Sequence, residues 1–178
     1  MNKSNKLAGC MTFLLIPLFL LAACGMNASF NTDQDKVAAV AAEIADFELP
    51  IGYSPEFSAS FDVYTLVSYT PGKGSSHLYL VQSQNAADAE KLLQAMKDII
   101  PGEYDPAAGM TAIETRPVTV RGEQTTLILS EGLNGEGESY RQAVVAFKGN
   151  GGPALLVFST PVAAWNLETL EALVASIQ

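Results

Sequence analysis

The N-terminal segment constrains the rest of this chain more than any other feature. Lys3 and Lys6 form a short positive region, and the apolar run MTFLLIPLFLLAA over residues 11–23 leads directly to Cys24. A positive start, about a dozen apolar residues and small residues before a break are typical of a secretory signal peptide. Cleavage before Cys24 also removes Cys10, so no intramolecular disulfide is possible and a hydrophobic core has to hold the fold.

The end of this segment, Leu21-Ala22-Ala23-Cys24, resembles a bacterial lipobox. The resemblance implies that residues 1–23 are a lipoprotein signal peptide, that Cys24 is acylated, and that residues 24–31 are a short tether. The lipid would hold the protein on the cell membrane or outer membrane, facing the periplasm or the exterior. Two alternatives stay open. A transmembrane anchor would need ~20 apolar residues, and an ordinary secretory signal would leave Cys24 as a free thiol.

The composition describes one acidic globular domain over residues 32–178. The chain of 178 residues has 10 Lys+Arg and 19 Asp+Glu, for a formal net charge of −9, and is 48% hydrophobic. Loss of two lysines with the signal peptide makes the mature charge −11. This balance disfavours a nucleic-acid partner, which needs a basic surface, and the hydrophobic fraction disfavours disorder. One His and two Cys make a His/Cys metal centre improbable, so no cofactor is expected.

Three helices are predicted from caps and apolar spacing. Thr32 is expected to cap a helix that begins at Asp33, Asn85 a second helix, and Asn166 a third. The apolar stripes are Val37, Val40, Ala41 and Ile44 in the first helix, Ala89, Leu92, Leu93, Met96 and Ile99 in the second, and Leu167, Leu170, Leu173, Val174 and Ile177 in the third.

Strands are predicted between these helices. Alternating residues 57–69 indicate a strand with one buried face, or two strands joined by a bend, and residues 77–83 return as the hairpin partner. Residues 111–121, 124–130 and 140–148 resemble a meander joined by hairpin turns. The continuous apolar run ALLVFS, residues 154–159, indicates a strand covered on both faces.

This order of elements predicts an α+β domain, with a mainly antiparallel sheet and helices on both faces. The segment FELPIGY at residues 47–53, the strand order and the terminal helix ending in Ala-Ser-Ile resemble the PsbP/LpqN/DcrB group of α/β/α sandwiches. The resemblance covers most of residues 45–178. Many members of that group are bacterial lipoproteins and act mostly as binding or assembly factors. The group has no shared catalytic residues, so the resemblance implies no site.

An acidic loop is the best metal candidate in the sequence. Glu131, Glu136 and Glu138 flank a glycine-rich stretch with Asn134, and such oxygen ligands could bind Ca²⁺. The spacing of a calcium-binding loop is missing, however, and acidic residues are ordinary in a solvated hairpin. The prediction is therefore no metal, with these glutamates as weak candidates.

Three arginines are the weak candidates for a binding surface. Arg116, Arg121 and Arg141 lie in or near the predicted central strands and could contact an acidic partner or a phosphate. Pairing with local glutamates such as Glu114 and Glu123 is the commoner outcome.

Catalytic motifs are not evident. His77 is the single histidine and has no Gly-x-Ser-x-Gly elbow beside it, so a surface or hairpin role is expected. The glycine-rich segments at residues 72–75 and 149–152 lack the spacing of nucleotide-binding loops and are interpreted as turns. The leading hypothesis is a non-catalytic lipoprotein that binds or helps to assemble another envelope protein. The alternatives are a carrier of a small apolar ligand and a carboxylate-based hydrolase.

Overall fold

The computed structural model describes residues 28–72, 76–99, 109–133 and 137–178 of the protein. The expected signal peptide, Cys24 and the loop residues Asn134 and Glu136 lie outside the described residues. Within the described ranges, no helix has the length and apolar character needed to cross a membrane.

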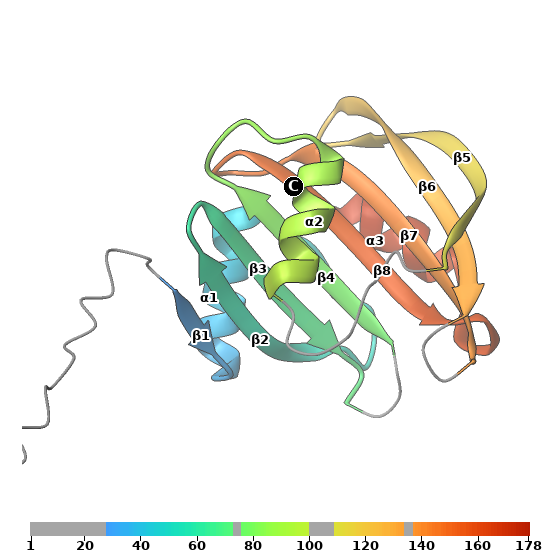
Figure 1. The fold of residues 1–178 in the computed structure, drawn as a ribbon, viewed down its shortest axis with the longest axis horizontal. Coiled ribbons are helices and arrows are strands. Elements are labelled where there is room, and N and C mark those ends of the chain that lie inside the picture. The colour runs from blue at the N-terminus through green and yellow to red at the C-terminus, as the bar shows by residue number, and fades with distance from the viewer. Residues whose placement is uncertain (1–27, 73–75, 100–108, 134–136) are drawn as a thin grey trace, which may run out of the picture.

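The described residues form an α+β fold with one antiparallel sheet, as expected (Figure 1). The strands are β1 (Ser29–Asn31), β2 (Ser54–Phe61), β3 (Tyr64–Thr70), β4 (His77–Ser83), β5 (Thr111–Val120), β6 (Glu123–Leu133), β7 (Ser139–Lys148) and β8 (Pro153–Pro161). The helices are α1 (Gln34–Ile44), α2 (Ala89–Ile99) and α3 (Leu167–Ser176), with a 3₁₀ turn at Val162–Ala164. The strand order is β1-β2-β3-β4-β8-β7-β6-β5.

Strand periodicity directs alternate residues of the sheet to two separate cores. In β4, Leu78 and Leu80 join a cluster with residues of α1 and α3, whereas Tyr79 and Val81 join a cluster with α2. Helix α2 therefore lies on one face, in front of the sheet in Figure 1, and α1 and α3 lie on the other.

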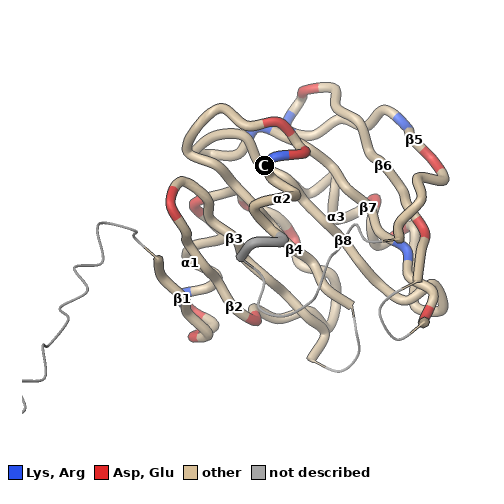
Figure 2. Tube along the Cα trace, in the orientation of Figure 1, with Lys and Arg blue, Asp and Glu red and all other residues tan. Residues whose placement is uncertain are grey.

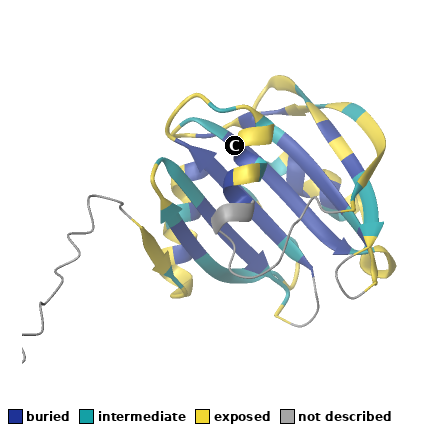
Figure 3. Cartoon of the chain, viewed as in Figure 1, coloured by how far each residue is buried: buried dark blue, intermediate teal, exposed yellow. Residues whose placement is uncertain are grey.

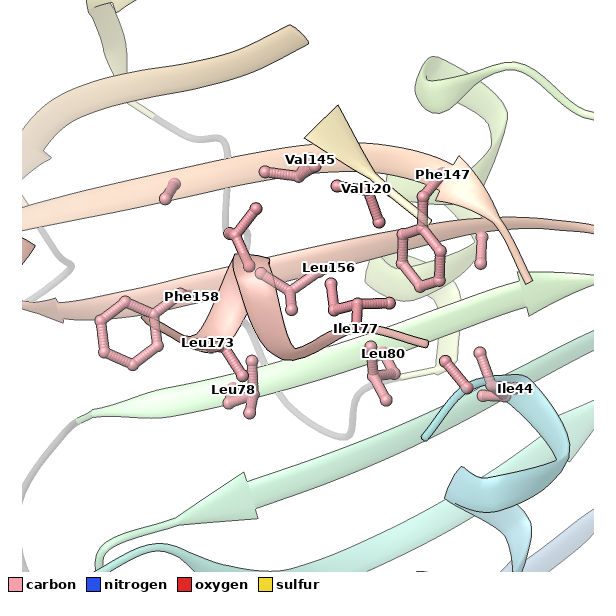
Figure 4. Close-up of a cluster of buried hydrophobic side chains, with 14 of the residues drawn as sticks. Ile44, Leu78, Leu80, Val120, Val145, Phe147, Leu156, Phe158, Leu173 and Ile177 are labelled. Carbon is pink, nitrogen blue, oxygen red and sulfur yellow. The ribbon is translucent and has the colours of Figure 1, made fainter. Parts of the chain in front are cut away.

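The larger core lies between the sheet and helices α1 and α3 (Figure 4). Leu156, at the centre of β8, is fully buried there and is flanked in register by Leu80 and Val145. Leu173 and Ile177 close this core from α3. Figure 3 shows the buried central strands and the more exposed sheet edges.

The helix caps differ in part from the predictions. Asp33, not Thr32, caps α1 by accepting a hydrogen bond from the Lys36 amide at 3.1 Å. Asp88, not Asn85, accepts the amide of Lys91 at 2.9 Å at the start of α2. In both cases a carboxylate oxygen of an aspartate next to the helix accepts the amide, in place of the Thr32 hydroxyl or the Asn85 amide oxygen.

Asn166 caps α3 as predicted, accepting the Thr169 amide at 3.1 Å. The predicted buried stripe of this helix is confirmed at Leu170, Leu173, Val174 and Ile177. Leu167 is the exception, with 41% of its surface exposed, because the first residue of the helix lies beyond the edge of the core.

The predicted strands are confirmed, and residues 57–69 form two strands rather than one. The expectation of a single buried face is wrong for β3, where Leu66, Val67, Ser68 and Tyr69 are all buried. This strand lies inside the sheet with helices on both sides, so both of its faces are covered. Residues 29–31, assigned to the tether from sequence, instead form the edge strand β1.

The turn at residues 149–152 closes one end of the larger core, beside α1. The Asn150 amide donates to the Ile44 carbonyl at 2.8 Å, and the Gly151 amide donates to Oε1 of Gln82 at 2.9 Å. A Cβ atom on Gly152, whose φ is +154°, would lie 2.2 Å from the Ser83 carbonyl oxygen. The glycines of this turn thus serve close packing.

Candidate functional site

Arg141, a candidate from the sequence, is held within the sheet. It lies opposite Glu131 in the β6–β7 register and forms an ion pair and hydrogen bonds with that carboxylate. Its guanidinium also lies 5.2 Å from the centre of the Trp165 ring, a cation–π arrangement. Arg141 therefore fastens β7 to β6 and to the segment before α3.

Arg116 and Arg121 each have different partners. Arg116 pairs with Glu171 of α3 at 2.9 Å and lies 3.8 Å from Glu114, the local glutamate expected from the sequence. Arg121 donates to the Lys148 carbonyl and to Oδ1 of Asn150, both at 2.9 Å. The structure does not join the three arginines in one patch, and Figure 2 shows the basic positions dispersed over the domain.

Two of the three candidate glutamates of the acidic hairpin lie within the described residues. Glu131 is occupied by Arg141, Glu138 is exposed, and Glu136 falls outside the described residues. Searching the described part of the chain finds no group of three or more His, Cys, Asp and Glu residues placed to hold a metal ion.

His77 belongs to a polar cluster that joins three strands. A bulge at Glu56 in β2 interrupts the register with β3, and bulges commonly redirect a side chain. Oε2 of Glu56 lies 3.5 Å from Nδ1 of His77 and accepts a 2.6 Å hydrogen bond from the Ser68 hydroxyl. The imidazole stacks on Tyr79, with 5.5 Å between ring centres. Because Ser68 donates to the carboxylate, this contact orients Glu56 and does not activate the serine through His77.

A groove lies where the loop between α1 and β2, residues 45–53, meets the start of α3. We call it the α3 groove, and its volume is about 320 Å³. It is lined by Glu48, Leu49, Pro50 and Ile51 from the loop and by Asn166, Glu168, Thr169, Ala172 and Leu173 from α3 and its cap.

Hydrogen bonds hold the loop against α3. Asp46 and Gln178 exchange two backbone hydrogen bonds, at 2.8 and 3.2 Å. The Glu48 amide donates to the Ser176 hydroxyl at 2.9 Å, and this hydroxyl donates to the Leu173 carbonyl at 2.7 Å. The loop wall of the groove is therefore fixed to the α3 wall through Ser176 and Gln178.

A tight turn presents Ile51 to solvent. The Tyr53 amide donates to the Pro50 carbonyl at 3.1 Å, and Gly52 has a φ of +89°. A positive φ at the third position is the requirement for glycine in a type II turn. Ile51 precedes it at the tip and is fully exposed.

Aromatic side chains fix the inner side of the same loop. Phe47 meets Tyr69 edge to face with ring centres 5.6 Å apart, and Tyr53 lies 5.9 Å from Phe158. Burial raises the pKa of Tyr69 to about 12. Burial also raises the pKa of Tyr53, and a side-chain hydrogen bond with Ser76 partly offsets that shift. Both phenols are therefore neutral packing groups at neutral pH.

The α3 groove combines apolar and acidic linings. Leu49, Pro50 and Ile51 supply apolar surface, and the lining residues include two glutamates, Glu48 and Glu168, and no Lys or Arg. Leu167, next to the groove in sequence, is exposed as well. Such a surface suits a ligand with an apolar side chain and positive charge beside it.

Sequence reasoning did not assign a function to this groove. The sequence of residues 47–53 supports only a resemblance in fold, and the apolar spacing predicts that Leu167 is buried in the core. One available signal was Ile51, an apolar residue between Pro50 and Gly52, where a turn would expose it. The meeting of this turn with α3 depends on contacts across more than 100 residues of sequence, such as Glu48 with Ser176.

Comparison with known proteins finds no protein-family model that matches this chain and no significant match among curated proteins.

Proposed function

We propose that the protein is a lipid-anchored envelope protein whose domain binds another envelope protein without catalysing a reaction. The N-terminal pattern ending at Cys24 supports the anchor. The observation that carries the binding role is the α3 groove, a fixed surface hollow with an exposed isoleucine at its rim. We further propose that the fold belongs to the PsbP/LpqN/DcrB-type α/β/α sandwiches, and the helices on both sheet faces support this assignment.

The lining of the groove defines the chemistry of the partner. A volume of about 320 Å³ is near the lower limit for ligand pockets, which suits one or two side chains of a protein segment. Glu48 and Glu168 favour Lys or Arg on that segment, while Ile51 and Leu49 favour an apolar side chain. The partner is therefore a protein segment with an apolar anchor residue flanked by basic residues.

The anchor is tested by fatty-acid labelling in the native cell. Cys24→Ala is expected to abolish both labelling and membrane retention, because it removes the thiol that would be acylated. Cys10→Ala is the matched control and is expected to leave both unchanged. Labelling that persists in the Cys24→Ala chain would refute the assignment.

The binding role is tested by placing a photo-crosslinking amino acid at Ile51. Irradiation of native cells is expected to give a discrete adduct with one envelope protein. Ile128 serves as the control position. Its neighbours Leu127 and Leu129 belong to the larger core, on the α1 and α3 side of the sheet. Alternation along the strand therefore directs the Ile128 side chain to the opposite face. No adduct from Ile51, or the same adduct from both positions, would count against the groove.

A further inference from the structure

Phenylalanine side chains gather at the β1 edge of the sheet. Phe30 of β1 stacks on Phe57 of β2, with 5.5 Å between ring centres, yet 59% of Phe30 remains exposed. Phe61, at the end of β2, is 39% exposed. We call Phe30, Phe57 and Phe61 the aromatic edge.

Register places these side chains on one face. Phe30 lies opposite Ala59, and residues 57, 59 and 61 of β2 pair with Ser68, Leu66 and Tyr64 of β3. Leu66 and Tyr64 belong to the α2-side cluster. The aromatic edge therefore belongs to the α2 face of the sheet and borders solvent at its outermost strand, which is at the left in Figure 3.

The aromatic edge is also where the expected anchor enters the domain. Four residue steps separate Cys24 from Ala28, the first described residue, and β1 begins at Ser29. Even a fully extended chain covers at most about 14 Å in four steps. Because β1 begins one residue further on, an acylated Cys24 would keep the start of β1 within about 18 Å of the membrane surface.

We propose that the aromatic edge rests on the lipid surface and orients the anchored domain, an inference that depends on the proposed lipid anchor. Phenylalanine can insert its ring at the boundary between headgroups and acyl chains, where burial of apolar surface is favourable. The three residues of β1 carry no charge, whereas the mature chain as a whole is strongly acidic. An anionic membrane would therefore repel β1 itself less than the acidic parts of the domain, which include Asp62 directly after Phe61.

This orientation has a consequence for the partner-binding surface. The α3 groove lies on the opposite side of the sheet from the face that carries the aromatic edge. With the β1 edge on the lipid, the groove stays open to a second envelope protein.

The experiment measures fluorescence quenching by brominated lipids, using the full lipidated protein in phosphatidylcholine vesicles. The single tryptophan, Trp165, is first replaced by phenylalanine (Trp165→Phe), so that each introduced tryptophan is the one that is measured. Phe30→Trp and, separately, Phe61→Trp then report on the aromatic edge. Ile113→Trp is the matched control, because Ile113 is 51% exposed and lies on β5, at the other edge of the sheet.

At least twofold quenching is expected for Phe30→Trp and Phe61→Trp, and less than a tenth of that effect for Ile113→Trp. Vesicle flotation in the same samples separates the two claims. Protein that floats without quenching at either phenylalanine position, or with equal quenching at Ile113→Trp, overturns the aromatic edge but leaves the anchor intact. Protein that fails to float overturns the anchor and the inference that depends on it.

Discussion

Ionisation of Tyr69 is expected to weaken the fold above pH 10. Tyr69 is buried in β3 and packs against Phe47 in the loop that forms one wall of the α3 groove. Burial disfavours the phenolate and raises the pKa of Tyr69 from 10.0 to about 12. The same phenol loses its proton near pH 10 in the unfolded chain, so the stabilisation is complete below pH 10 and is lost as the pH rises through 12.

The magnitude follows from the two pKa values. At pH 11 the unfolded chain has released the proton and the folded protein has kept it, which lowers the free energy of unfolding by about 1.4 kcal/mol. The loss approaches about 2.7 kcal/mol once the pH exceeds both values. Tyr53, whose pKa burial also raises, contributes in the same direction.

The assay is urea unfolding followed by far-UV circular dichroism at pH 8 and pH 11, with the Cys24→Ala chain as the parent. Tyr69→Phe keeps the ring against Phe47 and removes the ionisable hydroxyl. The stability of the parent relative to Tyr69→Phe is expected to fall by about 1.4 kcal/mol between the two pH values. A constant difference between the two chains would refute the assignment of the alkaline loss to Tyr69.

Three further substitutions test the fold by urea unfolding. Leu156→Ala leaves a cavity in the main core and is expected to lower the free energy of unfolding by about 2–5 kcal/mol; a loss below 1 kcal/mol would contradict its central place. Gly152→Ala should cost more than Gly122→Ala, because a Cβ on Gly152 meets the Ser83 carbonyl whereas Gly122 has open space; equal losses would show that backbone strain alone matters. Asn166→Ala removes the α3 cap and is expected to cost about 1 kcal/mol, and an unchanged midpoint would argue against that cap.

Much of the fold was predictable because its elements carry strong local periodicity. The helices around Val37, Leu92 and Leu170 and the buried strand 154–159 follow directly from apolar spacing. The cap of α3 was predictable as well, but the cap of α1 was not, since Thr32 and Asp33 both carry a side-chain oxygen that can accept the amide and lie one residue apart. The burial of Ser68 could not be predicted from the sequence for a different reason. Its hydroxyl donates a hydrogen bond to Glu56, and the bulge in β2 lies at that residue.

The candidate site was less predictable, because it depends on pairs that are distant in sequence. Arg141 looked available for binding, but the β6–β7 register places it opposite Glu131. Arg116 reaches Glu171 of the C-terminal helix. Edge strand β1 was missed because three residues are too few to show strand periodicity.

The most direct test of the account is the affinity of the partner captured from position 51. Ile51→Ala removes three exposed carbons that binding would bury, at about 0.8 kcal/mol each, and is expected to weaken binding roughly 50-fold. Ile128→Ala, on the opposite face of the sheet, should bind like the parent. If Ile51→Ala retains the parent affinity, or if both substitutions weaken binding equally, the α3 groove is not the partner-binding surface.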